Sequence, residues 1–287
     1  MKRKDGTRVT NEVPMYYIMP HILKERHDSM NMTTVDIPIA PLRKYMNAKR
    51  KEGIHISHMA LILTAYVQLI GEYPSLNRFV VNRKIYDHND IAVALVVLRP
   101  GNTGNDDTMS KLYFETTDTV FDVQRKIDEY IEKNTTGAEE DNNSLDKIMS
   151  VLVKMGGLMR VAISFLLWLD KHNLLPKAII DASPFHASLL ITNLASIRTN
   201  HIYHHVYDFG TTSISIAMGN MREVPKRMPD GTVELERCLP LGIVMDERIA
   251  SGHYLALAFA RMKEMLLHPE IMEQPGSNTA RVELYKK

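Results

Sequence analysis

Residues 239–252 read LPLGIVMDERIASG, and this stretch decides the fold. Its first half, Leu239 to Asp246, is an apolar run with the composition of a strand. Its second half is a short polar turn, and the last helix is expected to start near Ser251. An apolar stripe at helical spacing follows, formed by Leu255, Phe259, Met262 and Leu266, and Pro269 comes after it. The stretch therefore predicts a strand that turns directly into the last helix.

The region before this stretch also has the composition of strands. It predicts strands at residues 186–193, 202–207, 212–218 and 232–238, where β-branched and aromatic residues gather between polar turns. Two of these segments read LLITNLAS (residues 189–196) and, after a gap, YDFGTTSISIAMG (residues 207–219). The carboxyl-terminal half is thus expected to be a run of strands followed by one helix.

The amino-terminal half mixes helices with one buried strand. Helices are predicted at residues 41–51, from the cap Ser57 to Pro74, and over about residues 118–133, where Val120, Val123, Ile127 and Ile131 share one face. Residues 91–98 (IAVALVVL) are continuously apolar, as in a strand buried on both faces. The order lacks the regular alternation of a doubly wound fold and predicts an α/β sandwich with a mixed sheet.

The composition excludes several classes of protein. Lys+Arg 35 and Asp+Glu 34 leave a net charge of +1, whereas binding to nucleic-acid phosphates usually needs a basic surplus. Cys238 is the only cysteine, so no internal disulfide or thiolate zinc site can form. No dinucleotide fingerprint, phosphate loop or Gly-x-Ser-x-Gly elbow occurs, and the adjacent His204 and His205 would point to opposite faces of a strand. With no apolar leader after the basic start, a reducing, cytoplasmic compartment is expected.

Residues 150–169 (SVLVKMGGLMRVAISFLLWL) form the most apolar stretch of the chain. Lys154 and Arg160 interrupt it and Gly156-Gly157 divides it, which argues against a membrane span. The pattern favours two short helices that are buried or that pack on a partner subunit. For the longer region of residues 144–173, three purposes are open: to shape an apolar acyl pocket, to cover an oligomer contact, or ordinary core and interface packing.

The strand segments and the deciding stretch together resemble the catalytic domain of the dihydrolipoamide acyltransferases of 2-oxoacid dehydrogenase complexes, which share the chloramphenicol acetyltransferase-like fold. Residues 41–44 (PLRK) and 72–77 (EYPSLN) also look like parts of that family. The resemblance covers about residues 15–270. It implies a single acyltransferase-like domain there, with tails at residues 1–14 and 271–287, and a two-layer α/β sandwich of a mixed sheet with helices packed on it.

The resemblance also implies where the chemistry would occur, and the sequence departs from the family there. The family's second segment reads Asp-His-Arg-Val-x-Asp-Gly, in which the His takes the thiol proton of the acceptor or donor and the Asp orients the site. Here Asp246, Arg248 and Gly252 match, whereas Glu247 replaces the His and Ser251 replaces the Asp. Thr192 keeps the hydroxyl that donates to the tetrahedral intermediate. The candidate catalytic residues are Thr192, Glu247, Ser251 and His253, and the candidate substrate-binding residues are Asn193, Arg248 and Gly252.

Three explanations of the replaced base stay open. Glu247 is the base if burial raises its pKa from about 4.3 toward neutrality. His253, the nearest histidine, is a second candidate. In the third explanation the chain no longer catalyses acyl transfer by this route, and an ion pair of Glu247 with Arg248 or another arginine would favour that.

The predicted function is a stand-alone acyltransferase that accepts an acyl-coenzyme A thioester as substrate and holds no covalently bound cofactor and no metal. The chain shows no lipoyl or subunit-binding segment. By resemblance, it is expected to form homotrimers or larger trimer-based assemblies, with Thr192 of one subunit meeting Glu247 of the next. The alternative is a catalytically inactive trimeric scaffold, or a module that binds an acyl group or coenzyme A.

Overall fold

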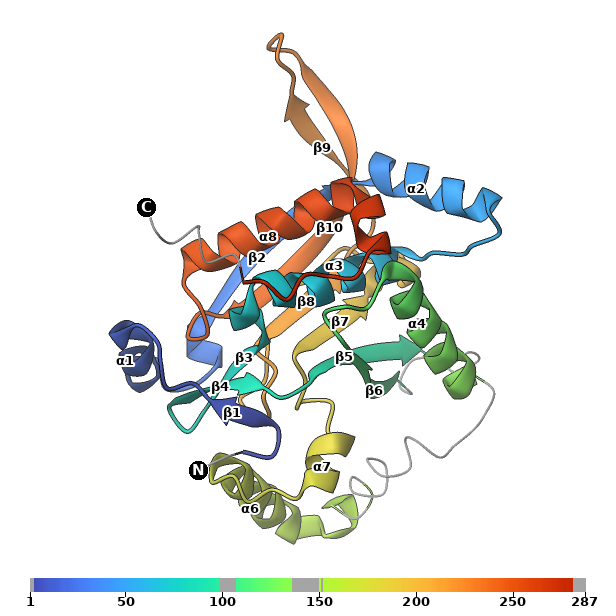
Figure 1. Cartoon of the computed structure of the whole chain (residues 1–287). Helices are drawn as coiled ribbons and strands as arrows, with labels where there is room; N and C mark the ends of the chain where they lie inside the picture. The colour runs from blue at the N-terminus through green and yellow to red at the C-terminus, as the bar shows by residue number, and fades with distance from the viewer. Residues whose placement is uncertain (1–2, 99–106, 136–149, 151, 281–287) are drawn as a thin grey trace.

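A large mixed sheet forms the centre of the molecule in the computed structural model, which describes residues 3–98, 107–135, 150 and 152–280. The sheet has seven strands in the order β2-β10-β8-β7-β5-β6, with β9 paired to β10. A second sheet of three strands has the order β1-β4-β3 (Figure 1). The strands are β1 (Gly6–Arg8), β2 (Met30–Pro38), β3 (Arg78–Val81), β4 (Lys84–His88), β5 (Ile91–Leu98), β6 (Asp107–Phe114), β7 (Leu189–Asn193), β8 (Ile214–Met218), β9 (Arg222–Arg227) and β10 (Val233–Asp246).

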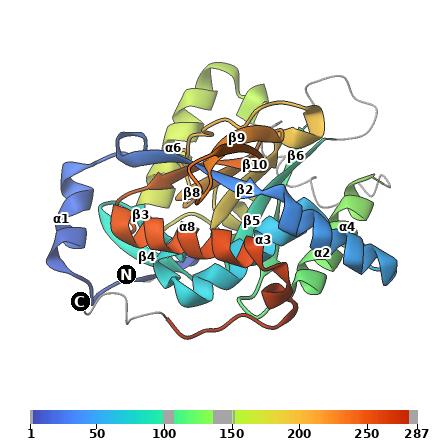
Figure 2. The same cartoon turned by 90° about the horizontal axis from the view of Figure 1, so that it is seen from above.

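The helices that follow the apolar patterns of the sequence pack on the large sheet. Helices α3 and α8 lie side by side over one of its faces, and seen from above α2 and α4 are on the same side (Figure 2). The α-helices are α1 (Pro14–Ile22), α2 (Ile39–Lys51), α3 (His58–Glu72), α4 (Val120–Thr135), α6 (Met159–Lys171), α7 (Lys177–Ala182) and α8 (Gly252–Leu267). The α/β sandwich with a mixed sheet is therefore confirmed.

Helix α3 forms the middle of the core. Its residues from Ala60 to Gly71 are all buried, and the predicted cap Ser57 accepts a hydrogen bond from the backbone N–H of Ala60. Helix α4 follows its predicted stripe except at Ile131, which is 42% exposed. The apolar periodicity of the sequence thus located both helices.

Strand β10 joins two strands that the sequence separated. The predicted strands at 232–238 and 239–246 form one continuous strand of 14 residues, antiparallel to β2, β8 and β9. Its first half and β9 make a hairpin that projects from the molecule (Figure 1). Strand β9 could not be predicted, because Arg222–Arg227 is charged and contains Pro225, which an edge strand tolerates.

The predicted strand at residues 202–207 is wrong. This segment is extended but pairs with no strand among the described residues, and it crosses one face of the sheet instead. The Ser215 hydroxyl donates a hydrogen bond to the carbonyl of His204, and the Thr34 hydroxyl lies 2.7 Å from the Tyr203 hydroxyl. Side chains of the sheet hold the segment, and no strand ladder does. Strand-like composition cannot distinguish an extended segment held in this way from a paired strand.

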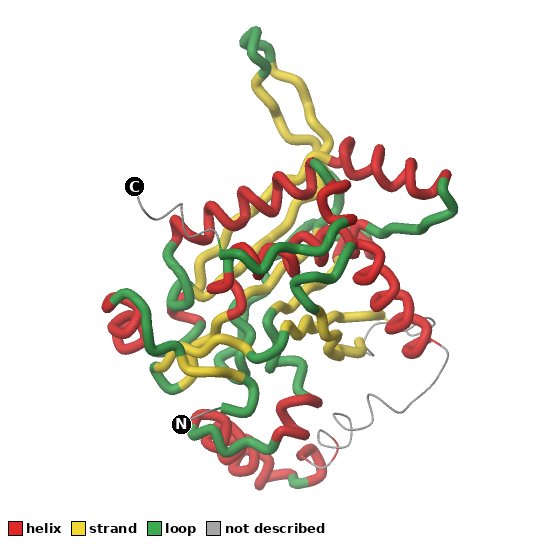
Figure 3. The backbone as a smooth tube through the Cα atoms, in the orientation of Figure 1, coloured by secondary structure: helices red, strands yellow, loops and turns green. Residues whose placement is uncertain are grey.

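The apolar region at residues 150–169 is helical but is not buried in the chain. It contains the short 3-10 helix Gly156–Leu158 and then α6, in which Asp170 is the one buried residue. The tube in Figure 3 shows these helices and α7 together at one end of the molecule. No helix of the described ranges is long and apolar enough to span a membrane.

Both terminal segments contact the domain. Strand β1 pairs with β4, and Arg3 is buried. At the other end, Gln68 of α3 donates a hydrogen bond to the carbonyl of Gln274, and the short helix Pro269–Glu273 buries Met272. These contacts extend the packed part of the chain beyond residues 15–270.

Candidate functional site

The turn between β10 and α8 is fixed by a buried ion pair. Asp246, at the end of β10, is fully buried and accepts hydrogen bonds from Arg248 Nε at 2.8 Å and Nη2 at 2.7 Å. Arg248 also donates to the backbone carbonyls of Leu23 and Lys24. Arg26 places a second guanidinium 3.5 Å from the Asp246 carboxylate. Removing one partner from such a pair would leave an uncompensated buried charge, so these groups hold the corner rigidly.

Glu247 occupies the next position, at the surface of this corner. Its backbone N–H donates to the carbonyl of Ser29, and its Oε2 accepts a hydrogen bond of 2.8 Å from Asn31 Nδ2. The side chain is half-buried and makes no ion pair among the described residues. Arg248 is paired with Asp246 instead. The neutral amide of Asn31 therefore orients the carboxylate, while the hydrogen bond to Ser29 fixes the backbone of Glu247.

Ser251, Gly252 and His253 begin helix α8. The Ser251 hydroxyl accepts a hydrogen bond from the backbone N–H of Tyr254, so it caps the helix that the sequence predicted to start near it. Gly252 is exposed, with open space where a Cβ would lie. His253 is exposed in the first turn.

A pocket of about 380 Å³ lies between β2, β10 and α8, and we call it the apolar pocket. Glu247 is not part of its lining. Asn31, which binds Glu247, lies in its wall, and Lys263 provides its one charged side chain. The other lining residues come from β2, β10 and α8 and are mostly apolar: Thr33, Val35, Met245, Gly252, Leu255, Ala256, Phe259 and Ala260. The lining therefore suits an aliphatic group.

Thr192 and Asn193 lie at the opposite end of the sheet. Thr192 pairs with Ala217 of β8, and Ala217 pairs with Gly242 of β10. Glu247 is five residues beyond Gly242, which corresponds to roughly 17 Å along a strand. Asn193 caps the short helix Leu194–Ile197 by accepting a hydrogen bond from the Ser196 N–H. A single chain therefore does not bring the hydroxyl and the carboxylate together.

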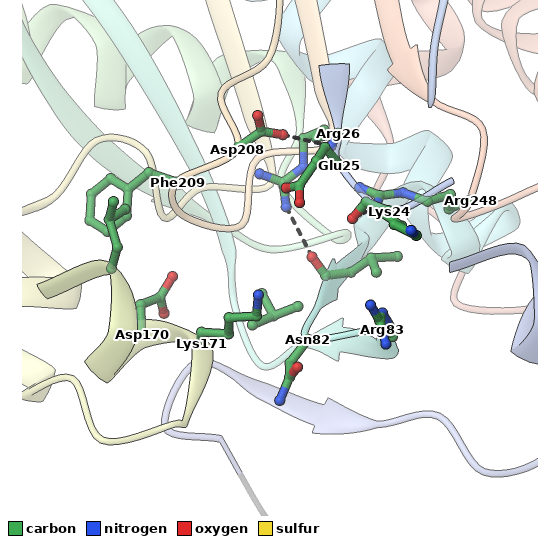
Figure 4. Close-up of a pocket in the computed structure, with 13 residues that line it drawn as sticks. Lys24, Glu25, Arg26, Asn82, Arg83, Asp170, Lys171, Asp208, Phe209 and Arg248 are labelled. Carbon is green, nitrogen blue, oxygen red and sulfur yellow. Dashed lines mark hydrogen bonds between the residues drawn. The ribbon is translucent and has the colours of Figure 1, made fainter. Parts of the chain in front are cut away.

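A larger pocket, of about 520 Å³, lies on the other side of the Asp246–Arg248 pair (Figure 4). We call it the cationic pocket, because basic side chains from separate segments line it: Lys24, Arg26, Arg83, Lys171 and Arg248. Asn82 and Arg83 form the turn between β3 and β4, both with positive φ. This pocket could not be predicted from sequence patterns, since its walls come from segments far apart in the chain.

Sequence reasoning also missed the partners of the corner. Arg26 and Asn31 precede or begin β2 and reach Asp246 and Glu247 only because β2 pairs with β10. His27 Nδ1 lies 2.8 Å from Asp208 Oδ2, and the hydrogen bond and charge of Asp208 raise the pKa of His27. A charged run such as KERHD (residues 24–28) has no spacing that would single these residues out.

Comparison with solved structures places the whole chain in one fold. A probable dihydrolipoamide acetyltransferase from Listeria monocytogenes superposes with a TM-score of 0.56 at 15% identity, covering 91% of this chain and 95% of that one. Chloramphenicol acetyltransferase superposes with a TM-score of 0.53 at 10% identity, covering 91% and 99%. The chain has the chloramphenicol acetyltransferase-like fold.

The dihydrolipoamide acetyltransferase of Azotobacter vinelandii is similarly related, with a TM-score of 0.54, 14% identity and coverage of 92% and 94%. No family model matches the sequence, and no curated protein does. At these identities the likeness establishes the fold and leaves the activity to the site itself.

Proposed function

We propose that this chain is an acyltransferase that takes its acyl group from a coenzyme A thioester. The observation that carries the proposal is the Glu247 carboxylate, which makes no ion pair with a described residue and is oriented by Asn31, a residue of the apolar pocket's wall. A thiol or hydroxyl acceptor is mostly protonated at neutral pH and needs a base near the thioester. Glu247 is the group so placed, whereas Ser251 is engaged in capping α8 and His253 is exposed.

The second part of the proposal is that the site is shared between subunits of a trimer. Thr192 and Glu247 lie at opposite ends of one sheet, so a hydroxyl that stabilises the oxyanion must come from a neighbouring chain. In that arrangement Asn193, Arg248 and Gly252 lie close to the reacting groups of the two subunits.

Release of free thiol from acyl-coenzyme A donors of increasing chain length tests the activity. Replacing Glu247 by Gln is expected to slow turnover by about 10²–10⁴-fold, the usual contribution of a general base. Glu234→Gln, on the exposed hairpin, is the matched control and should keep full activity. Full activity of Glu247→Gln would refute the carboxylate as base.

Mixing two inactive variants tests the shared site. Glu247→Gln and Thr192→Val are each expected to be inactive alone. After the subunits are exchanged, mixed trimers contain interfaces in which both residues are native, so part of the activity should return. No recovery from variants that demonstrably exchange subunits would contradict a site built from two chains.

A non-catalytic scaffold or binding module is the second candidate, favoured by the use of Ser251 as a helix cap where the family has an orienting Asp. Glu247→His combined with Ser251→Asp restores the family's pattern, and Asp is itself a good cap. If the wild type is inactive and this double variant transfers acyl groups, the substrate-binding site is intact and only the base was lost. Activity of the wild type would refute this candidate.

A further inference from the structure

Helix α6 carries an exposed apolar stripe. Leu158, Val161, Phe165 and Trp168 recur at spacings of three, four and three residues, which places them on one face. All four are exposed, and Val161 is the most so at 64%. The Trp168 ring stacks on the His172 ring at 4.4 Å, which continues the stripe by one turn. Contiguous exposed apolar surface of this kind marks an interaction site.

Basic side chains border the stripe. Arg160 and Lys171 are exposed on the adjoining face of α6, and neither has an acidic partner among the described residues. The acidic residue of the helix, Asp170, is buried and bound to Arg3. The outward surface of α6 therefore offers apolar and positively charged groups, and no exposed carboxylate.

The cationic pocket continues this surface. Leu167 and Lys171 of α6 form part of its wall, and Lys24 and Arg83 line it from other segments (Figure 4). Lys24, Arg83 and Lys171 make no ion pair within the described ranges. Two exposed acids, Glu25 and Asp208, also line the pocket, and Asp208 is already bound to His27. Charge alone thus favours an anionic group at the base of the stripe.

We propose that this end of the molecule docks on an anionic phospholipid surface. Helix α6 would lie in the plane of the interface, as an amphipathic helix does, with Phe165 and Trp168 among the upper acyl chains. Arg160 and Lys171 lie at the level of the headgroups, and the cationic pocket receives a lipid phosphate. The stripe is one face of a single helix and crosses no bilayer.

Trp168 is the only tryptophan. With excitation at a wavelength that the 12 tyrosines do not absorb, the emission of the unmodified chain therefore reports on the stripe alone. Vesicles that contain phosphatidylglycerol are expected to shift its emission to the blue and to carry the protein upward in a density gradient. Phosphatidylcholine vesicles should do neither. Equal binding to both kinds of vesicle, or binding to neither, would overturn the proposal.

Variants of matched exposure separate the stripe from surface hydrophobicity in general. Val161→Ser with Phe165→Ser should weaken vesicle binding by about tenfold or more. Val233→Ser with Leu235→Ser, on the hairpin and 64% exposed at both positions, should leave it unchanged. Lys171→Glu should weaken binding by about fivefold or more, because each cation near an anionic surface contributes to attraction.

A second copy of the chain is the competing occupant of the stripe, and protein concentration distinguishes it. A blue shift that grows with protein concentration in the absence of vesicles would assign the stripe to self-association and refute the lipid proposal, provided that Val161→Ser with Phe165→Ser abolishes the shift. Free inorganic phosphate that competes with the vesicles would support the pocket as the headgroup site, and the absence of any competition would refute that part.

Discussion

Asp170 shows how one residue attaches a whole helix. It is the buried residue of α6, and its carboxylate accepts a 2.7 Å bond from Arg3 Nη2 and lies 3.4 Å from His186 Nε2. Burial alone would raise its pKa, but the hydrogen bond and charge of His186, together with those of Arg3, lower it to about 2. The ion pair, more than apolar packing, holds α6 to the body of the protein.

Asp170→Asn is therefore expected to reduce the free energy of unfolding at pH 7 by about 1.5–3 kcal/mol, because a charged hydrogen bond is lost and Arg3 keeps only Asp5 as its carboxylate partner. The wild-type pKa lies below the unfolded value of 3.8, so the carboxylate's contribution is complete above that pH and is lost as the pH falls toward 2. At pH 3 the wild type should already have lost about 1 kcal/mol of it. Urea unfolding at pH 7, 5 and 3 measures both effects.

Asp181→Asn is the control for this substitution, since Asp181 pairs with Lys177 on the neighbouring helix but is exposed. Its effect should be within about 0.5 kcal/mol at each pH. A gap between wild type and Asp170→Asn that stays constant down to pH 3 would show that the carboxylate's charge is not the source of the stability.

At the scale of elements, two glycines let the segment at residues 201–207 approach the sheet closely. A Cβ built on Gly242 of β10 would lie 2.3 Å from the carbonyl oxygen of Ile202, and one on Gly219 would lie 2.2 Å from the backbone nitrogen of His201. Backbone atoms cannot move aside as a flexible side chain can. The two glycines thus allow an extended segment to cross β8 and β10 in direct contact.

Gly242→Ala is expected to destabilise the protein by about 1–3 kcal/mol, the usual cost of overpacking. Gly157→Ala is the matched control, because nothing lies within 4 Å of the position its Cβ would take. Thermal unfolding of both variants measures the difference. Equal melting temperatures would mean that residues 201–207 do not contact the strand.

This segment also shows which elements cannot be predicted from sequence patterns alone. Long periodic helices such as α3 and continuous apolar strands such as β5 were predicted, because burial imposes a regular pattern on the sequence. A segment such as 202–207 has the composition of a strand whether or not it pairs. Strand β9 does pair, but its charged sequence lacks a strand-like composition. Only the tertiary arrangement decides these cases.

In the candidate site, too, some residues could be predicted from the sequence and others could not. The family resemblance located the turn at Asp246 and Glu247, and the apolar stripe located the start of α8 near Ser251. Arg26 and Asn31 could not be found, because they meet these residues across more than 200 positions of sequence. Their contacts depend on the register of β2 against β10, which a single sequence does not specify.

At the scale of the whole molecule, the large sheet ends in an open edge. Strand β2 pairs with β10 on one side and with no described strand on the other. Asn31 and Met32 are exposed on it, and Met32 is 50% accessible. An edge of this length offers free N–H and C=O groups to another chain, and in the proposed trimer a neighbour would cover it beside Glu247.

Met32→Glu places a charge on that edge and should therefore dissociate the oligomer. Native mass spectrometry of the wild type is expected to give three times the 32.8 kDa of one chain, and the variant should shift toward one. Met15→Glu, on α1 and 57% exposed, is the matched control and should remain trimeric. Acyl transfer should be lost together with the trimer, because a single chain holds Thr192 and Glu247 at opposite ends of its sheet. A wild type that stays monomeric while it turns over acyl-coenzyme A would refute the shared site.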